Sequence, residues 1–274
     1  MDLTKHLAAL AQPDPAARRA ALETALAAEG LTFETQDGAA DERTPRPPRN
    51  YYVWPDGDET PCPLFCAHYD AWPGSPGAND NAAALCILIS LAVTLRQKGV
   101  RAAFAFFDGE ETGHTGAKMF EETRQREFSV LVNLDVCGYG DTITVYPKGG
   151  QRKPAAAVFV DKVRMKAHNA RIVGFIPEGD DVCFRSSRQP VLAMAVMPKW
   201  DTKFLDAAAG HGGGFFGLPP ELRMALGEME VMSTMHGGFK DKVDWVQPRA
   251  MQQVYDYLLD AMTAPLPGKR LGLF

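Results

Sequence analysis

The chain has 274 residues, 46% of them hydrophobic and 23% charged, which is enough apolar material to bury a sizeable core in one or two domains. A net charge of −5 gives no basic surface, so we expect no nucleic-acid partner. The first residues lack the basic and apolar segments of a secretory signal, and no uninterrupted apolar run reaches membrane-spanning length. We therefore expect a cytoplasmic protein with no membrane partner. Its five cysteines, odd in number and mostly in apolar surroundings, are expected to be reduced and buried.

The N-terminal part of the sequence predicts a helical cover followed by strands. Residues 3–11 and 14–28 are rich in alanine and leucine at helical spacing, with prolines between them. Before residue 70 we also expect a strand at 31–35, a polar, proline-rich loop at 36–50, and a hairpin of two strands at 51–54 and 63–67.

The rest of the sequence alternates between strand and helix patterns. Residues 80–97 predict a buried helix, because their apolar side chains leave almost no polar face, and Asn79 or Asp80 suits its N-cap. Further helices are expected at 115–126, 155–170 and 248–262, and strands at 100–107, 128–135, 142–146 (at the sheet edge) and 190–196. This alternation predicts an α/β fold with a mixed, mainly parallel central sheet and helices on both faces.

Imidazole and carboxylate side chains follow three of the predicted strands or open the helix between them. The segments are His68-Tyr69-Asp70, Gly77-Ala78-Asn79-Asp80-Asn81, Asp108-Gly109-Glu110-Glu111 and Asn133-Leu134-Asp135. Because ligands in open α/β sheets bind at the carboxyl ends of the strands, we expect these side chains to converge there. One histidine with several carboxylates suits a divalent metal, zinc above all, with Co²⁺ or Mn²⁺ as further candidates.

A carboxylate-rich centre of this kind suits amide hydrolysis. The reaction needs a nucleophile stronger than water and a positive charge to stabilise an oxyanion. Two divalent ions roughly 3.5–4 Å apart supply both. Such a pair needs one shared carboxylate, about two further ligands per ion, and a carboxylate that carries the proton from water to the leaving amine. The sequence contains enough groups for each of these tasks.

Together these segments resemble the motifs of the M28 family of metallopeptidases, the di-zinc aminopeptidases. His68-Tyr69-Asp70 matches the family's His-x-Asp, and Met235-His236, with Asp241 after it, resembles the final histidine segment. Residues 77–81 match Gly-Ala-x-Asp-Asn, residues 108–116 match Asp-Gly-Glu-Glu-x-Gly-x-x-Gly, and residues 133–135 match Asn-Leu-Asp. The resemblance covers roughly residues 50–260 in the family's order.

The resemblance implies two zinc ions per chain and a role for each matched residue. Asp80 would be shared by both ions, and the other ligands would be His68, Asp135, Glu111 and His236, with the first pair on one ion and the second on the other. Glu110 would act as general base and then acid. Asp70 would orient His68 by accepting the proton of its other ring nitrogen, as is common for metal-bound histidine.

Two segments depart from the family's pattern. Residues 179–184 stand where the family has Ser-Asp-His-x-x-Phe; Asp180 and Phe184 keep its Asp and Phe and are expected to bind substrate, whereas Asp181 replaces the His. Two glycines replace the usual Thr-Pro after His236. His114 and His211 lie in glycine-containing loops and are expected to face solvent, with a place along the cleft as the alternative. The methionines of 224–235 suit either an apolar pocket or the core.

The resemblance implies an exopeptidase that removes residues from peptides with a free N-terminus. The whole chain would form one domain, with a helical cover at 1–48 and a catalytic core at 50–263. A one-zinc enzyme resembling glutaminyl cyclases is the runner-up, although such enzymes usually have Asp-Ser where this chain has Asp80-Asn81. The same motifs also suit a carboxypeptidase or dipeptidase of the family, whereas a degenerate binding module would have lost ligands that this chain keeps.

Overall fold

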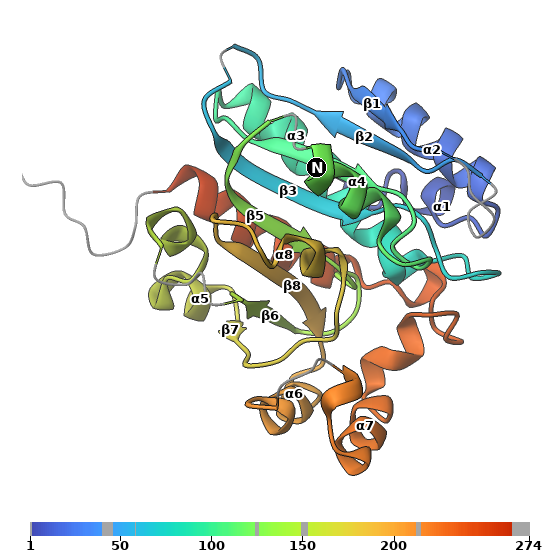
Figure 1. Ribbon diagram of the computed structural model, residues 1–274, viewed down its shortest axis with the longest axis vertical. Helices are drawn as coiled ribbons and strands as arrows, with labels where there is room; N and C mark the ends of the chain where they lie inside the picture. The colour runs from blue at the N-terminus through green and yellow to red at the C-terminus, as the bar shows by residue number, and fades with distance from the viewer. Residues whose placement is uncertain are drawn as a thin grey trace, which may run out of the picture.

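A mixed eight-stranded sheet lies at the centre of the computed structural model, which describes residues 2–39, 46–57, 59–123, 126–148, 153–211 and 215–264 (Figure 1). From one edge to the other, the strands are β1 (Glu34–Asp37), β2 (Arg49–Val53), β4 (Ala103–Phe107), β3 (Cys62–His68), β5 (Phe128–Leu134), β8 (Val191–Met197), β6 (Thr142–Tyr146) and β7 (Ala170–Ile172). The predicted fold class is confirmed.

The middle of the sheet is parallel. β3 pairs in parallel with β4 on one side and β5 on the other, and β5 pairs in parallel with β8. Nearly every residue of these four strands is buried, as expected for strands covered on both faces. Since β3, β4 and β5 run the same way, the residues that follow them lie along one edge of the sheet.

The predicted hairpin of residues 51–54 and 63–67 is wrong. β2 pairs antiparallel with β1 and β4, and β4 separates it from β3. The near-continuous apolar run of β3 is typical of a parallel strand buried in the middle of a sheet. Burial of this run between β4 and β5 outweighs the turn signal at residues 55–57. The expected edge strand at 142–146 is also wrong in position, because β7 pairs with β6 and forms the edge.

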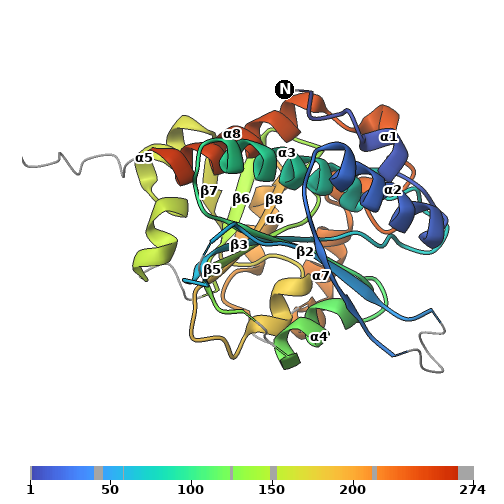
Figure 2. The same cartoon turned by 90° about the horizontal axis from the view of Figure 1, so that it is seen from above.

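Helices cover both faces of the sheet (Figure 2). On one face lie α1 (Leu7–Leu10), α2 (Pro15–Ala28), α3 (Ala83–Gln97) and α8 (Pro248–Thr263). On the other face lies α4 (Thr115–Thr123), and α7 (Pro220–Gly227) lies beyond the end of β8 (Figure 1). The remaining helices are α5 (Lys162–Ala167) and α6 (Thr202–Ala208), and short helical turns lie at Ala78–Ala82, Pro154–Phe159, Asp180–Phe184, Phe215–Gly217, Glu230–Thr234 and Val243–Trp245.

The main hydrophobic core lies under α3 and α8. It joins apolar side chains of these helices and of the sheet to Leu7 and Leu10 of α1 and Leu22 and Leu26 of α2. The segment Ala78–Gln97 is the one helix in the described part of the chain that is long and apolar enough to cross a membrane, but 83% of its apolar window is buried inside the protein. Its hydrophobicity is that of a core helix.

One expected helix is interrupted, another starts late, and the cysteines are free. The helix expected at 155–170 divides into a 3-10 turn and α5, because Asp161 caps α5 by accepting from the amides of Val163 and Arg164. All five cysteines are unpaired, three of them buried and Cys62 and Cys183 half-buried. The helix expected at 80–97 starts later than predicted, with consequences for the site described next.

Candidate metal centre

His68 ends β3 and faces the edge of the sheet with its imidazole almost fully buried. Its Nδ1 lies 3.3 Å from Oδ1 of Asp70 and 3.2 Å from the Asp70 carbonyl oxygen. The Asp70 carboxylate also accepts hydrogen bonds from the backbone amides of Glu110 (3.0 Å) and Glu111 (3.1 Å), which follow β4. Asp70 therefore fixes the ring of His68 and ties together the loops that follow two adjacent strands.

Asp80 does not cap a helix, so that prediction is wrong. The backbone at Asp80 (φ −116°, ψ 79°) and Asn81 (φ −138°, ψ 27°) is not helical, and regular helix begins at Ala83. The Asp241 carboxylate accepts the amide protons of Asn79 (2.9 Å) and Asp80 (3.2 Å) in place of an N-cap side chain. The Asp80 carboxylate is thereby free to face His68.

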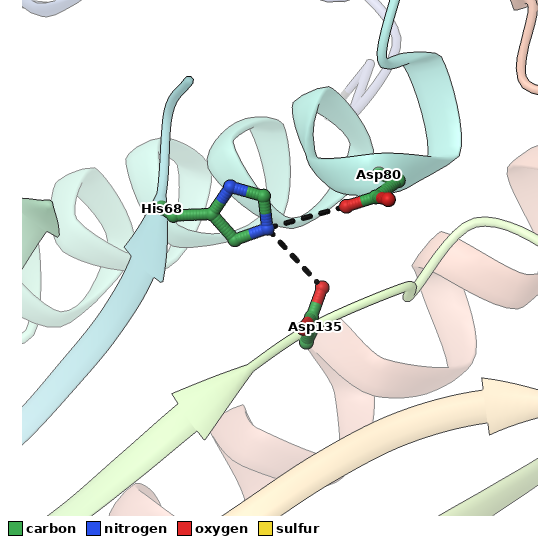
Figure 3. Close-up of side chains that lie close together, drawn as sticks. All are labelled: His68, Asp80 and Asp135. Carbon is green, nitrogen blue, oxygen red and sulfur yellow. Dashed lines mark ion pairs between the residues drawn. The ribbon is translucent and has the colours of Figure 1, made fainter. Parts of the chain in front are cut away.

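The first group of donor atoms comes from His68, Asp80 and Asp135 (Figure 3). Nε2 of His68 lies 3.2 Å from Oδ1 of Asp80 and 3.4 Å from Oδ1 of Asp135, the residue that follows β5. The three donor atoms lie within 4.8 Å of one another, close enough to surround one metal ion.

The second group comes from Asp80, Glu111 and His236, and it also fits within 4.8 Å. Nε2 of His236 lies 3.9 Å from Oε2 of Glu111, and the His236 amide donates to Oδ2 of Asp80 at 2.9 Å. His236 has a left-handed backbone (φ 48°), and its ring lies against that of Trp72, with centroids 5.3 Å apart. Asp80 thus belongs to both groups.

The donor set fits divalent metal ions. Nε2 of His68, Oε1 of Glu111 and Oδ1 of Asp135 are buried, yet none has a hydrogen-bond partner among the described residues. Burial raises the pKa of Glu111, and the carboxylate of Asp80 raises it further. Nε2 of His68 faces Asp80 and Asp135 only as ion pairs. Burying such atoms without hydrogen bonds is costly, and bound cations would remove that cost. Imidazole nitrogen and carboxylate oxygen are ligands that zinc accepts.

Glu110 lies beside both groups but belongs to neither. It lines the same pocket as Asp80, Asp135 and His236, and burial raises the pKa of its carboxyl strongly. Nδ1 of His114 lies 3.3 Å from Oε1 of Glu110 and 3.3 Å from Oδ1 of Asp180. The prediction that His114 faces solvent is wrong: its left-handed backbone (φ 59°) turns the ring back onto these two carboxylates, where 21% of the side chain is exposed.

An apolar pocket opens next to these carboxylates. Its wall contains the side chains of Val136, Ile176, Met194, Met197, Met229, Val231, Met232 and Met235. Asp181 lies in the same pocket, buried and in an ion pair with Lys148. Three methionines of the 224–235 segment therefore line a pocket, whereas Met224 is exposed on α7.

Most of the predicted site residues come together, and one does not. Phe184 lies in the core under α4, where its ring packs against Phe107, Phe120 and Phe128. His211 is exposed and makes no contact with the donor groups. Sequence reasoning missed the contributions of His114 and Asp241, although the five-residue spacing between His236 and Asp241 was visible.

Comparison with known proteins identifies the family of the chain. A sequence model described as "Peptidase family M28" matches residues 52–213, more than half of the chain, and no curated protein matches the chain.

Several solved structures share the fold at low identity. They include the LapA aminopeptidase of Legionella pneumophila (15% identity, 95% of this chain and 69% of that chain, TM-score 0.63), a glutaminyl cyclase of Porphyromonas gingivalis (17%, 95% and 96%, 0.71) and a Zn-dependent exopeptidase of Parabacteroides distasonis (16%, 96% and 97%, 0.69). At these identities the structures show the fold alone. By its sequence match, the chain belongs to peptidase family M28.

Proposed function

We propose that this protein is a metal-dependent aminopeptidase that uses two divalent ions, zinc foremost, to hydrolyse the N-terminal bond of peptides. The observation that carries the proposal is the pair of donor groups that share Asp80. Each group offers three ligand atoms, the number that catalytic zinc sites take from the protein while a position stays open.

Two ions account for the site better than one. An ion in the second group alone would leave Nε2 of His68 and Oδ1 of Asp135 buried without a hydrogen bond, 3.4 Å from each other, and an ion in the first group alone would leave Oε1 of Glu111 buried without one. Each such atom costs up to about 1–3 kcal/mol. Two ions, one in each group, would satisfy all three atoms. This argument disfavours the one-zinc, cyclase-like enzyme.

The roles proposed for the residues follow from their contacts. Divalent ions bound here would lower the pKa of water and stabilise negative charge on the substrate's carbonyl oxygen. Glu110 lies beside both donor groups without belonging to either, so its carboxylate is free to accept a proton and return it to the leaving amine. Asp70 holds the tautomer of His68 that leaves Nε2 unprotonated. Asp180, through His114, holds the side chain of Glu110 in place.

The charge of the site favours a substrate with a free α-amine. Five carboxylates gather here, those of Asp70, Asp80, Glu110, Glu111 and Asp135. Two divalent ions would offset four of their negative charges, and Asp180 is a further anion nearby. The remaining negative potential attracts an ammonium group next to the scissile bond. The apolar pocket with its methionine wall suits the side chain of the N-terminal residue.

The test of this proposal compares three substrates on zinc-reconstituted protein. A short peptide with an N-terminal leucine should be cut from its amino end, and its N-acetylated form should not be cut. A third peptide with an N-terminal glutamine should lose that residue by hydrolysis. Loss of ammonia from it would favour the cyclase, and cleavage of the capped peptide from its carboxyl end would favour a carboxypeptidase. Mass spectrometry distinguishes these products.

Two neighbouring substitutions test the division of roles. Glu110→Gln should keep both metal ions and lose activity by about 10²-fold or more, because it removes the proton carrier. Glu111→Gln should instead lower the metal content, because it removes a ligand. Elemental analysis of the two purified variants, together with their kcat values, gives the answer. Equal metal loss in both would contradict the assignment.

A further inference from the structure

An arginine of the N-terminal helix α2 reaches the back of the donor groups. Arg18 is 1% exposed, although it carries a charge. Its three kinds of guanidinium nitrogen each donate to a backbone carbonyl: Nε to Tyr69, Nη1 to Pro76 (2.6 Å) and Nη2 to Gly77 (2.9 Å). The accepting residues lie at the two ends of the loop 69–77.

This arginine is buried without a paired carboxylate. No ion pair in the described part of the chain includes Arg18. Removing a guanidinium from water without a partner charge carries a large desolvation penalty. Burial lowers the pKa of Arg18, and the carboxylates of Asp70, Asp80 and Asp241, which form no ion pair with it, offset only part of that lowering. Because Arg18 is buried despite this penalty and its guanidinium donates to carbonyls of the loop 69–77, we expect it to stabilise the conformation of that loop.

The loop in question controls the positions of two site carboxylates. Asp70 lies next to its first anchored carbonyl, and Asp80 follows three residues after the last. At Gly77 the backbone is left-handed (φ +60°), and a Cβ there would meet the Asp80 carbonyl oxygen at 2.5 Å and Nη1 of Arg18 at 2.9 Å. The guanidinium therefore packs directly against the turn that leads into Asp80. A guanidinium donates to these carbonyls from three separate nitrogens at fixed spacing, whereas an ammonium has all its donors on one nitrogen.

We propose that Arg18 is a positioning residue of the metal centre: its guanidinium fixes the distance between the two ends of the loop 69–77, and so the placement of Asp70 and Asp80. This inference rests on the proposed metal-dependent function. It assigns a role to the N-terminal segment, which lies outside the part of the chain that matches the family.

The test uses Arg18→Lys and Arg18→Met, with Arg164→Lys and Arg164→Met as matched controls. Arg164 is likewise buried (2% exposed) and donates to backbone carbonyls, those of Val158 and Ala264, and to Asp260, none of which is a donor residue. For each metal-free variant, zinc affinity is measured by competition with a chromophoric chelator. The visible absorption of the Co²⁺-loaded form and the thermal midpoint are also recorded.

Both Arg18 variants should bind zinc about 10–100-fold more weakly than the native protein and show an altered Co²⁺ spectrum. Lysine should not restore the native affinity, because its single nitrogen cannot take the positions of three separate guanidinium nitrogens. The Arg164 variants should lose thermal stability but keep native zinc affinity.

The outcomes separate the inference from the function on which it rests. If the native protein binds no zinc, the proposed function fails. If the native protein binds zinc and Arg18→Lys binds it equally well, the positioning role is overturned and at most the charge matters. If neither Arg18 variant folds while both Arg164 variants do, Arg18 is a purely structural residue, and the inference is likewise overturned.

Discussion

Replacing Asp241 by alanine should destabilise the protein and weaken its metal binding, although Asp241 belongs to neither donor group. Its carboxylate is fully buried and accepts three hydrogen bonds, from the hydroxyl of Ser75 (2.6 Å) and the amides of Asn79 (2.9 Å) and Asp80 (3.2 Å). These bonds hold the irregular turn that precedes α3. Without them, the carboxylate of Asp80 loses its fixed direction.

The size of the effect follows from the three donors left behind. Each buried, unpaired donor costs about 1–3 kcal/mol. Water entering the vacated space recovers part of this, so the lower figure applies to each donor and the total is about 3 kcal/mol. For a protein of this size, that corresponds to a fall in Tm of about 6–12 °C. Asp241→Asn keeps one acceptor oxygen and removes the charge that repels Asp80, so it should cost less, about 1 kcal/mol.

Thermal unfolding followed by circular dichroism, with and without zinc, measures the loss of stability. A competition with a chelator measures the loss of zinc affinity. The two variants should rank in the same order in both assays, with alanine the more severe. Native zinc affinity in Asp241→Ala would refute the reasoning, because the turn at Asp80 would then keep its shape without these bonds.

Two further substitutions test the backbone of the site. Gly77→Ala should abolish zinc binding and lower Tm, because its Cβ would lie 2.5 Å from the Asp80 carbonyl oxygen. Gly30→Ala places alanine in the same left-handed backbone conformation (φ +66°), but no atom lies within 4 Å of its Cβ. It should therefore lower the free energy of unfolding by about 1–2 kcal/mol and leave the zinc content unchanged. His114→Asn, which tolerates the left-handed backbone, should lower kcat about tenfold at full metal occupancy, because Glu110 loses its partner. A drop in bound zinc in this last variant would contradict the role given to His114.

The strand-end residues of the site could be predicted because their positions depend on the order of a parallel sheet. His68 follows an apolar run in β3, Glu110 and Glu111 follow one in β4, and Asp135 follows one in β5. These runs are visible in the sequence, and adjacent parallel strands bring their ends together. His236 follows no strand, and only the resemblance to the family identified it.

The parts that could not be predicted depend on contacts across long stretches of sequence. Asp80 was expected to cap a helix, but its amide is satisfied by Asp241, 161 residues further along, so no local signal indicates the turn. The hairpin prediction failed because β2 pairs with β4, whose residues lie about 50 positions later in the chain. His114 sits among glycines, as solvated loop residues do, and only its left-handed backbone brings it to Glu110.

A last prediction concerns the protons that the metal-free site must hold. Burial, and then the Asp80 carboxylate, raise the pKa of Glu111 to about 8, so at pH 7 this carboxyl is mostly protonated without metal. Zinc must displace that proton, because a metal ligand has to be deprotonated. His68 must likewise be neutral to bind zinc; burial lowers its pKa, but its contacts with Asp135, Asp70 and Asp80 raise it well above the usual value. Zinc affinity should therefore rise as the pH increases from about 6 to 8 and continue to rise above the pKa of Glu111. Calorimetric titrations at pH 7 in two buffers of different ionisation enthalpy should show protons released on binding, and Glu111→Gln should release fewer. Identical heats in both buffers would mean that the carboxylates are already ionised in the metal-free protein. Some other cation of the chain would then have to balance them, and Arg18, whose Nη2 donates to the Gly77 carbonyl three residues before Asp80, is a group that could do so.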